Sequence, residues 1–553
     1  MYKYDEIDQR ILNERVQQFR GQMDRYLAGE LTEEEFLPLR LQNGLYIQRF
    51  APMFRIAIPY GMINSTQLRK LAEISRNYDR GYVHFTTRQN VQFNWHQLEQ
   101  VPDSLAELAS VEMHANQTSG NCIRNTTTDQ FAGVIADEVA DPRPYCEIIR
   151  QWSTFHPEFA FLPRKFKIAV NASPSTDRAA VQVHDIGLQL VRNDAGELGF
   201  RVYVGGGLGR TPVIGSVIRE FLPEQHLLSY LESILRVYNR YGRRDNKFKA
   251  RIKILVRAMT PEVFAQKVEE DWIHAKDGPN TLTREEVARV SQFFTEPAYE
   301  TLEDNPPVLL DKLETVKAFN KWYHRNVNRH KKPGYAIVTL TLKKVGTAPG
   351  NMSDTELEKI AELAERYSFG EARITHEQNV VLADIRQQDL FEVWQEIKAL
   401  GLATPNLGLL TDIICCPGGD YCSLANAKSI PVAEAIQARF DDVDYLWDLG
   451  ELDLNISGCM NACGHHHVGN IGILGVDKKG EEWYQVSLGG SSGHETRLGD
   501  ILGPSFAREE MPDVLEKILN VYVESRIEGE LFVDTYRRIG ITPFKERVYA
   551  KAH

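Results

Sequence analysis

The chain repeats itself at a spacing of about 285 residues. GYVHFTTRQNVQF (81–93) resembles GEARITHEQNVVL (370–382), and two later pairs follow in the same order, HDIGLQLV (184–191) with VGNIGILGV (468–476) and FRVYVGGGLGR (200–210) with WYQVSLGGSSG (483–493). The three offsets are 289, 285 and 284 positions, read between Gln89 and Gln378, Ile186 and Ile471, and Gly205 and Gly489. Coincidental α/β patterning is the alternative. The near-constant offset favours an internal duplication with halves near 45–300 and 335–553.

Each repeat reads as a strand, a helix and a strand, followed by a second α/β unit. The runs FRIAIP (54–59) and YAIVTLTL (335–342) precede LRKLAEISRNYDR (68–80) and LEKIAELAERYSF (357–369), whose apolar residues recur at helical spacing. This order predicts an α+β protein with pseudo-twofold symmetry and one shared site where the halves meet. The predicted segments are a charged helical arm, two units in the first half, a Pro-containing linker and two units in the second half, at 1–45, 46–135, 145–300, 301–330, 331–405 and 408–553.

Composition narrows the function classes. The net charge of −12 argues against a general nucleic-acid binder, which needs a basic face. The sequence contains no run of about 18 apolar residues, so no membrane span is predicted. Its polar start lacks the apolar core of a secretory signal. Seven cysteines in 553 residues are too few for a secreted disulfide scaffold. We therefore expect a cytoplasmic protein with no membrane or nucleic-acid partner.

Four of the seven cysteines form a pattern of their own. TDIICCPGGDYCSLANAKS (411–429) and LNISGCMNACGHHHVGN (454–470) give Cys-x5-Cys and Cys-x3-Cys, at Cys416, Cys422, Cys459 and Cys463. Structural zinc sites prefer pairs separated by two to four residues, so the longer gap fits poorly. Four thiolates on two glycine-containing loops suit a 4Fe–4S cluster. Zinc and buried, unliganded cysteines remain the alternatives on spacing alone.

The neighbouring cysteines and histidines are less informative. Cys415 adjoins Cys416, and adjacent residues of an extended segment face opposite sides, so only one of the two is expected to reach a cofactor. Cys415, Cys122 and Cys146 are predicted to be small buried hydrophobic residues. The triplet His465, His466 and His467 suits a metal site or a polar loop equally well, and no catalytic role is assigned to it.

Several motifs together resemble one family. Cys-x5-Cys followed by SGCMNACG, TTRQNVQF (86–93), FLPRKFKIAV (161–170) and the duplication itself resemble the sirohaem-dependent sulfite and nitrite reductases, most closely the sulfite reductase haemoprotein. The likeness runs from about residue 45 to the C-terminus. It implies a duplicated sirohaem reductase fold, with a ferredoxin-like half-domain and a larger sirohaem/4Fe–4S unit in each half.

The resemblance also implies roles for individual residues. The four patterned cysteines become ligands of the 4Fe–4S cluster, and Cys463 becomes the thiolate shared with the sirohaem iron. Asn461 takes a family-typical position near the cluster. The expected cationic pocket above the haem consists of Arg88, Arg124, Lys165 and Lys167. Alternation in Lys-Phe-Lys puts both lysines on one strand face, which could also be an ordinary solvated face.

Two further segments bear on the cofactors. VGGGLGR (204–210) fails the dinucleotide fingerprint because Arg210 replaces its last glycine, so no nicotinamide or flavin site is predicted. Gly206 and Gly207 are instead expected to let the chain pass close to the sirohaem. NRYGRRDNKFKARIKI (239–254) is the most basic stretch. It suits either contact with the sirohaem carboxylates or docking of an acidic electron donor.

The predicted activity is the six-electron reduction of sulfite to sulfide, with electrons from a ferredoxin or a flavoprotein subunit. The alternative within the family is reduction of nitrite to ammonia. Plant-type nitrite-reducing members tend to carry asparagine at the position of Lys167, so lysine favours the sulfite dianion. A zinc scaffold or an iron–sulfur sensor would keep the cysteines, but neither needs the four cations.

Overall fold

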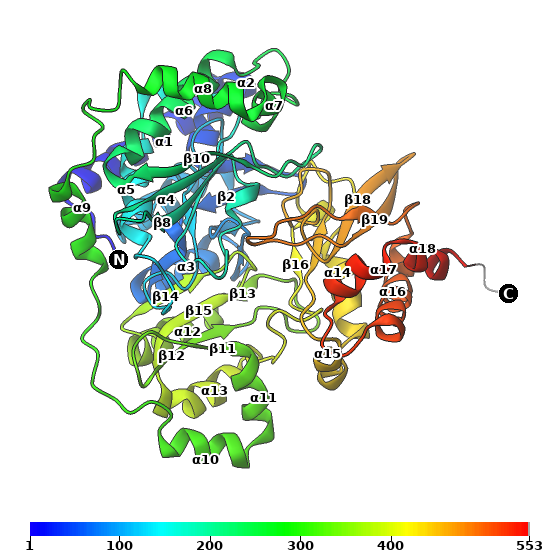
Figure 1. Ribbon diagram of the computed structural model, residues 1–553. Coiled ribbons are helices and arrows are strands. Elements are labelled where there is room, and N and C mark those ends of the chain that lie inside the picture. Colours follow the sequence, from blue (N-terminus) through cyan, green and yellow to red (C-terminus); the bar gives the residue numbers. More distant parts are fainter. Residues whose placement is uncertain (551–553) are drawn as a thin grey trace.

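The computed structural model describes residues 1–550 and contains four five-stranded sheets flanked by helices (Figure 1). The predicted α+β class and the duplicated architecture are confirmed, because the sheets form two matched pairs. In the view of Figure 1, helices α14 to α18 form a lobe beside β16, β18 and β19, and helices α10, α11 and α13 lie at the opposite end from α2, α7 and α8.

Each smaller sheet is antiparallel throughout and contains four strands from one repeat. The first has the order β1-β2-β5-β4-β13, with β1 (Leu45–Ile47), β2 (Pro52–Ile56), β4 (Tyr82–Phe85), β5 (Val91–Phe93) and β13 (Asn351–Ser353). The second has the order β11-β12-β15-β14-β3, with β11 (Val327–Arg329), β12 (Tyr335–Leu340), β14 (Glu371–Ile374), β15 (Val380–Arg386) and β3 (Met62–Asn64).

The fifth strand of each smaller sheet comes from the other repeat. β3 pairs with β14 at Ile63 and Ala372, and β13 pairs with β4 at Met352 and Val83. The exchanged strands lead directly into α3 (Ser65–Tyr78) and α12 (Asp354–Tyr367), which pack against each other. Both helices begin with a capping box, in which a side chain at the N-cap and one at N3 satisfy each other's free backbone amides. The two halves are therefore interlocked.

The two larger sheets have the same strand order and the same directions. β6, β7 and β8 are parallel neighbours, β9 and β10 are antiparallel, and β16 to β20 repeat this arrangement. Their bounds are β6 (Thr127–Thr128), β7 (Ile168–Asn171), β8 (Ile186–Arg192), β9 (Leu198–Val204), β10 (Ser216–Pro223), β16 (Ile414–Cys415), β17 (Leu454–Ser457), β18 (Ile471–Lys478), β19 (Glu481–Leu488) and β20 (Asp500–Ile501). In both sheets the second and third strands enter the ladder at corresponding residues, Ile168 with Ile186 and Leu454 with Ile471.

The segments outside the repeats are packed onto the body. The N-terminal arm forms α1 (Glu6–Leu27) and α2 (Glu33–Gln42), and buries Phe19 and Phe36 in the core of the smaller sheets. The predicted linker, 301–330, contains α10 (Pro307–Thr315) and α11 (Lys317–Asn326). Trp322 of α11 is fully buried in the same core, so this part of the chain is packed onto the body.

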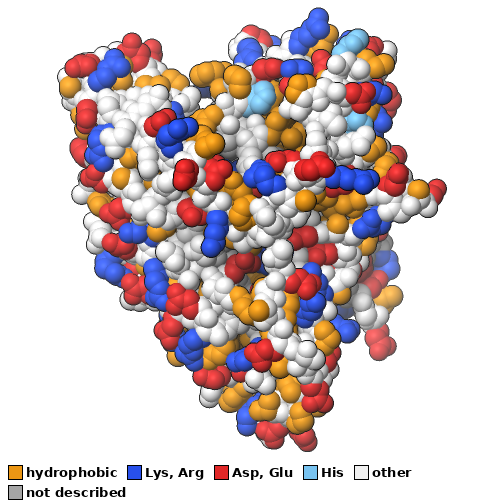
Figure 2. Space-filling view, turned by 90° about the vertical axis from the view of Figure 1, so that its left-hand side faces the viewer, with side chains coloured by type: hydrophobic (Ala, Val, Ile, Leu, Met, Phe, Trp, Pro, Cys, Tyr) orange, Lys and Arg blue, Asp and Glu red, His pale blue; other side chains and the backbone are white. Residues whose placement is uncertain are grey.

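The remaining helices cover the sheets. They are α4 (Val101–Ala109), α5 (Arg143–Ser153), α6 (Leu227–Tyr241), α7 (Ile252–Met259), α8 (Pro261–Trp272), α9 (Arg284–Ser291), α13 (Leu390–Ala399), α14 (Ile430–Arg439), α15 (Val443–Leu449), α16 (Met511–Ser525), α17 (Phe532–Ile539) and α18 (Thr542–Tyr549). One hydrophobic core serves both smaller sheets, and each larger sheet has its own. Figure 2 shows a face on which acidic and basic side chains are interspersed. No helix in residues 1–550 is long and apolar enough to span a bilayer.

We expect the stability of the interface between α3 and α12 to depend on apolar packing rather than on the surface ion pairs. Leu71 of α3 is fully buried in the shared core, whereas Arg76 reaches Asp354 and Glu358 of α12 at the surface. We expect Leu71→Ala to lower the free energy of unfolding by about 2–5 kcal/mol, through lost burial and the cavity left behind. Arg76→Ala, the control, should change it far less. Urea denaturation followed by fluorescence measures both, and equal losses would contradict this account.

Candidate functional site

A cavity at the junction of the two halves collects most of the predicted site residues. It encloses about 1340 Å³ that no protein atom occupies, part of it open to solvent. All nine of the following side chains line it: Arg88, Arg124, Lys165, Lys167, Cys416, Cys422, Cys459, Asn461 and Cys463. The cations come from the first half and the cysteines from the second, so the site exists only where the repeats meet.

Strand ends position these residues. Arg88 lies in the turn between β4 and β5, and Lys167 stands one residue before β7. Cys416 follows β16 directly, and Cys459 and Cys463 lie in the loop after β17. Each side chain is thus held at the end of an ordered strand, where loops converge without disrupting the sheet.

The two cysteine loops are packed tightly against each other. The Gly458 amide donates to Cys416 Sγ at 3.2 Å. A Cβ at Gly458 would lie 2.6 Å from the Ala427 carbonyl oxygen, and one at Gly418, where φ is +57°, would lie 2.4 Å from Ser429 Oγ. Only glycine allows this approach at both positions. Burial raises the pKa of the Cys416 thiol to about 12, so coordination to a metal is needed to make it a thiolate at neutral pH.

Cys463 differs from the other three cysteines because it is exposed. Its backbone carbonyl accepts a hydrogen bond of 2.8 Å from Thr87 Oγ1, next to Arg88. This bond joins the cysteine loop of the second half to the arginine turn of the first half. No three His, Cys, Asp or Glu side chains in the described part of the chain are close enough together to hold a single metal ion.

Backbone carbonyls fix the arginines of the cavity. Arg124 donates to the carbonyl oxygens of Thr118 and Gly120, both at 2.8 Å, and Arg88 Nη2 donates to the Asn125 oxygen at 2.6 Å. Arg88 Nη1 also lies 2.5 Å from His184 Nε2, whose pKa burial and the neighbouring cations push well below its usual range. His184 therefore accepts from Arg88 as a neutral imidazole.

The two lysines lack such partners. Neither Lys165 Nζ nor Lys167 Nζ has a hydrogen-bond acceptor among residues 1–550. Burial, followed by the neighbouring arginines, lowers the pKa of Lys167 well below its usual value, and burial lowers the pKa of Lys165 to about 8. Crowded positive charge in a partly buried cavity is relieved by an anion, so the cavity is suited to anionic ligands.

Sequence reasoning missed the acid that supports this cationic cavity. Asp185 is fully buried, accepts from the Lys167 backbone amide at 2.9 Å and pairs with Arg251 at 2.7 Å. Arg251 belongs to the basic stretch 239–254, which the structure divides. Arg251 and Lys253 turn inward, whereas Lys247 and its neighbours are exposed. The basic residues of 239–254 were visible in the sequence, but the acid that pairs with Arg251 lies 66 residues away, so sequence reasoning did not connect the two.

Gly206 and Gly207 do not belong to the lining of this cavity as it is formed by residues 1–550. A Cβ at Gly206 would meet the Gln182 carbonyl oxygen at 2.3 Å, so the close approach is to backbone. Lys253 Nζ donates to the carbonyl oxygens of Gly207, Leu208 and Thr211 and closes this loop. Contact of these glycines with the sirohaem stays a prediction.

The remaining cysteines and the histidine triplet are buried to different degrees. Cys415 and Cys146 are buried, as predicted, whereas Cys122 is half-buried. His467 Nε2 lies 3.0 Å from the Gly209 carbonyl oxygen, which ties the cysteine loop to the glycine loop. His466 is buried against His467, with ring centroids 3.9 Å apart.

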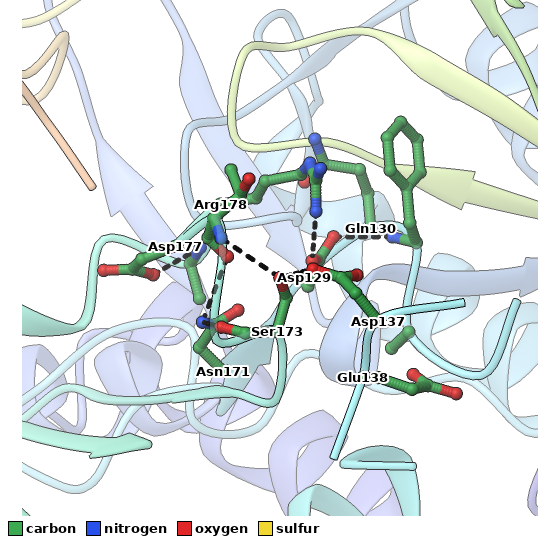
Figure 3. Close-up of polar contacts among 12 residues, drawn as sticks. Asp129, Gln130, Asp137, Glu138, Asn171, Ser173, Asp177 and Arg178 are labelled. Atoms are coloured by element: carbon green, nitrogen blue, oxygen red, sulfur yellow. Dashed lines mark hydrogen bonds and ion pairs between the residues drawn. The ribbon is translucent and has the colours of Figure 1, made fainter. Parts of the chain in front are cut away.

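The equivalent place in the first half contains an ion pair where the second half has cysteines. Asp129 follows β6 as Cys416 follows β16, and Ser173 lies two residues after β7 as Cys459 lies two residues after β17. Figure 3 shows Arg178, from the loop after β7, reaching Asp129. Arg178 Nη1 lies 2.9 Å from Asp129 Oδ2. Ser173 Oγ donates to Asp137 at 2.5 Å. Protein side chains thus fill this equivalent position.

The cationic positions are inverted in the same way. Glu377 follows β14 by three residues as Arg88 follows β4, and Asp453 precedes β17 as Lys167 precedes β7. Burial, with Asp412 nearby, raises the pKa of Glu377 to about 7. Only one of the two related positions therefore favours an anion.

Comparison with known proteins identifies the fold. The model of the nitrite and sulphite reductase 4Fe-4S domain matches residues 119–276 and 409–553, together more than half of the chain. The model of the nitrite/sulfite reductase ferredoxin-like half domain matches residues 49–111 and 329–400. The solved structure of the NirA protein of Mycobacterium tuberculosis, 24% identical, superposes with a TM-score of 0.77 over 96% of this chain and 97% of that one.

Two curated relatives are similar over most of their length. Sulfite reductase [ferredoxin] 1 of Mycolicibacterium paratuberculosis is 27% identical, over 87% of this chain and 81% of the relative. Ferredoxin–nitrite reductase of Synechococcus elongatus is 29% identical, over 84% of this chain and 85% of the relative. The expected cofactors, a sirohaem and a 4Fe–4S cluster, are those of this family. The chain is therefore an oxidoreductase of the sirohaem-dependent nitrite and sulfite reductase family.

Proposed function

We propose that this chain reduces sulfite to sulfide, taking six electrons one at a time from a ferredoxin. The observation that carries the proposal is one cavity lined by the four patterned cysteines and by five cations, which are Arg55, Arg88, Arg124, Lys165 and Lys167. Sulfite dianion, seven protons and six electrons give the hydrogen sulfide anion and three waters. The site must therefore bind an anion, accept electrons and deliver protons.

The four cysteines would bind the cofactors. Cys416, Cys422 and Cys459 would hold the cluster, and Cys463, exposed to the cavity, would be shared between the cluster and the sirohaem iron. Asn461 lies between the last two ligands. When bound, the two cofactors supply stored electrons and an iron atom for the substrate. The bond from Thr87 to the Cys463 carbonyl holds this residue below the cationic turn.

The cations would bind and protonate the substrate. Stripping water from a small anion costs solvation that fixed charges must replace, and each unit-charge contact at about 4 Å is worth roughly 4 kcal/mol at an effective dielectric of 20. Arg88 and Arg124 are held by carbonyl oxygens, so they suit binding. Lys165 and Lys167 have free ammonium groups and lowered pKa values, so they suit proton donation to the departing oxygens.

Nitrite reduction to ammonia is the second candidate. It is favoured by the similarity to the Synechococcus nitrite reductase, which is as strong as the similarity to the sulfite reductases. Lysine at 167 supports sulfite, because a second mobile cation matches the dianion. Both relatives are named as ferredoxin enzymes, which supports a ferredoxin donor here, with a flavoprotein subunit as the alternative. A reducing compartment such as the cytoplasm suits a cluster held by thiolates.

The lysines should be needed for turnover but not for cofactor binding. We expect Lys165→Met and Lys167→Met each to keep the visible spectrum of the holoenzyme and to lower sulfite turnover by about 10²–10⁴, the range for loss of a positioned proton donor. Anaerobic assays with a viologen reductant measure this. Normal sulfite turnover by both variants would show that neither lysine is needed as a proton donor.

Cys463→Ser should affect both cofactors together. If one sulfur belongs to the cluster and to the sirohaem iron, its loss alters the sirohaem bands as well as the iron and sulfide content. The absorption spectrum and iron analysis of the purified variant test this, with Cys415→Ser as the matched control that should retain both. Loss of the cluster with unchanged sirohaem bands would contradict sharing.

Lys167→Asn should shift the substrate preference. Removing one mobile cation weakens the site more for a dianion than for a monoanion, so the ratio of kcat/KM for sulfite to that for nitrite should fall by about tenfold, a difference of about 1.4 kcal/mol. Parallel assays of the two substrates with one artificial reductant give the ratio. An unchanged ratio would mean that residue 167 does not set the preference.

A further inference from the structure

A small surface patch outside the cavity contacts the loop that carries Cys422. It consists of Arg49, Phe50, Arg80 and Trp95, which we call the cluster-side patch. Phe50 is 60% exposed, and both arginines are exposed. None of the four residues belongs to the described lining of the cavity, so cofactors bound there leave the patch accessible.

The patch is an ordered unit rather than a chance group of side chains. The Arg80 guanidinium lies 3.5 Å from the centroid of the Trp95 ring, and Phe50 stacks on the same ring at 6.4 Å. The Trp95 backbone amide donates to buried Asp79 at 2.8 Å, and Trp95 Nε1 donates to Tyr82 Oη at 2.7 Å. Aromatic and arginine side chains held in fixed positions are the usual anchors of protein interfaces.

Direct contacts join the patch to the cysteine loop. The Trp95 and Tyr421 rings meet edge to face at 5.5 Å, and Tyr82 Oη lies 3.3 Å from Tyr421 Oη. Arg49 Nη1 donates to the Gly419 carbonyl oxygen, and the Arg49 backbone amide donates to the Tyr421 carbonyl oxygen, both at 3.4 Å. Tyr421 directly precedes Cys422. A protein seated on this patch would therefore stand beside a predicted cluster ligand.

Charge indicates the kind of partner. The chain carries a net charge of −12, so an acidic protein is repelled by most of its surface. Arg49 and Arg80 form no salt bridge with any other residue in 1–550, unlike Arg76, which pairs with Asp354 and Glu358. Asp79, which precedes Arg80 in the sequence, has a buried side chain that accepts a hydrogen bond from the Trp95 amide. Two unpaired cations around exposed aromatic rings are complementary to an acidic surface.

We propose that the cluster-side patch is the docking site of a small acidic iron–sulfur electron carrier, through which electrons enter the site. The inference rests on the proposed function, because it presupposes a cluster held by the 416–422 loop. A patch this small suits the weak, rapidly dissociating complexes typical of electron transfer. The other basic surface, around Lys247 and the 73% exposed Phe248, belongs to the outward part of 239–254.

The test uses the holoenzyme with a purified, chemically reduced acidic 2Fe–2S ferredoxin as the donor. Arg80→Glu reverses a charge in the patch, and Lys247→Glu makes the same change of charge on the other basic surface. We expect Arg80→Glu to raise the KM for ferredoxin about tenfold at low ionic strength, with the difference shrinking as salt is added. Phe50→Ala should raise the KM as well, without adding charge. Lys247→Glu should leave it unchanged.

Sulfite turnover driven by a viologen reductant separates this proposal from the proposed function. All three variants should keep wild-type activity with the viologen, because none of these residues lines the cavity. An unchanged ferredoxin KM in Arg80→Glu, or an equal rise in Lys247→Glu, would overturn the docking site. Wild-type turnover with viologen but none with ferredoxin would overturn the kind of partner. Absence of viologen-driven turnover in the wild type would instead refute the proposed function.

Discussion

The accumulation of positive charge in one cavity is the constraint on which the rest of the structure depends. Arg88, Arg124, Lys165 and Lys167 share the cavity, and the buried acid next to them, Asp185, is already paired with Arg251. Such a group is unfavourable by itself, since burial disfavours each charge and the charges repel one another. The fold sustains it with carbonyl oxygens on the arginines, and an anionic cofactor and substrate relieve it. Relief of this repulsion therefore contributes to the binding of an anionic ligand.

The two halves show how one fold can be given opposite electrostatics. Where the first half has Arg88 and Lys167, the second half has Glu377 and Asp453 at the same distance from the same strands. Where the second half has Cys416, the first has Asp129, neutralised by Arg178. The scaffold does not select the ligand; a few residues at strand ends do. One site is open to an anionic cofactor, and the related position is occupied by side chains.

Much of this could be read from the sequence, for identifiable reasons. The duplication was visible because Gln89 and Gln378 lie in turns flanked by strands of the same pattern. The cysteine pattern was visible because its ligands are close in sequence. The exchange of β3 and β13 could not be predicted from the sequence, because three-residue strands have no periodicity and their partners lie in the other repeat. The pair of Asp185 and Arg251 was equally hidden, because only the tertiary fold brings these two residues together.

The exchanged strands have a consequence for how such a chain can be divided. A cut in the connector between the repeats would leave two polypeptides, each lacking the edge strand of its own smaller sheet and carrying that of the other. Neither fragment would have a complete sheet, and each would present an open strand edge to its complement. The pieces would have to reassemble as an obligate heterodimer. A two-gene version of this architecture could therefore arise by simple fission, but its products could never become independent proteins.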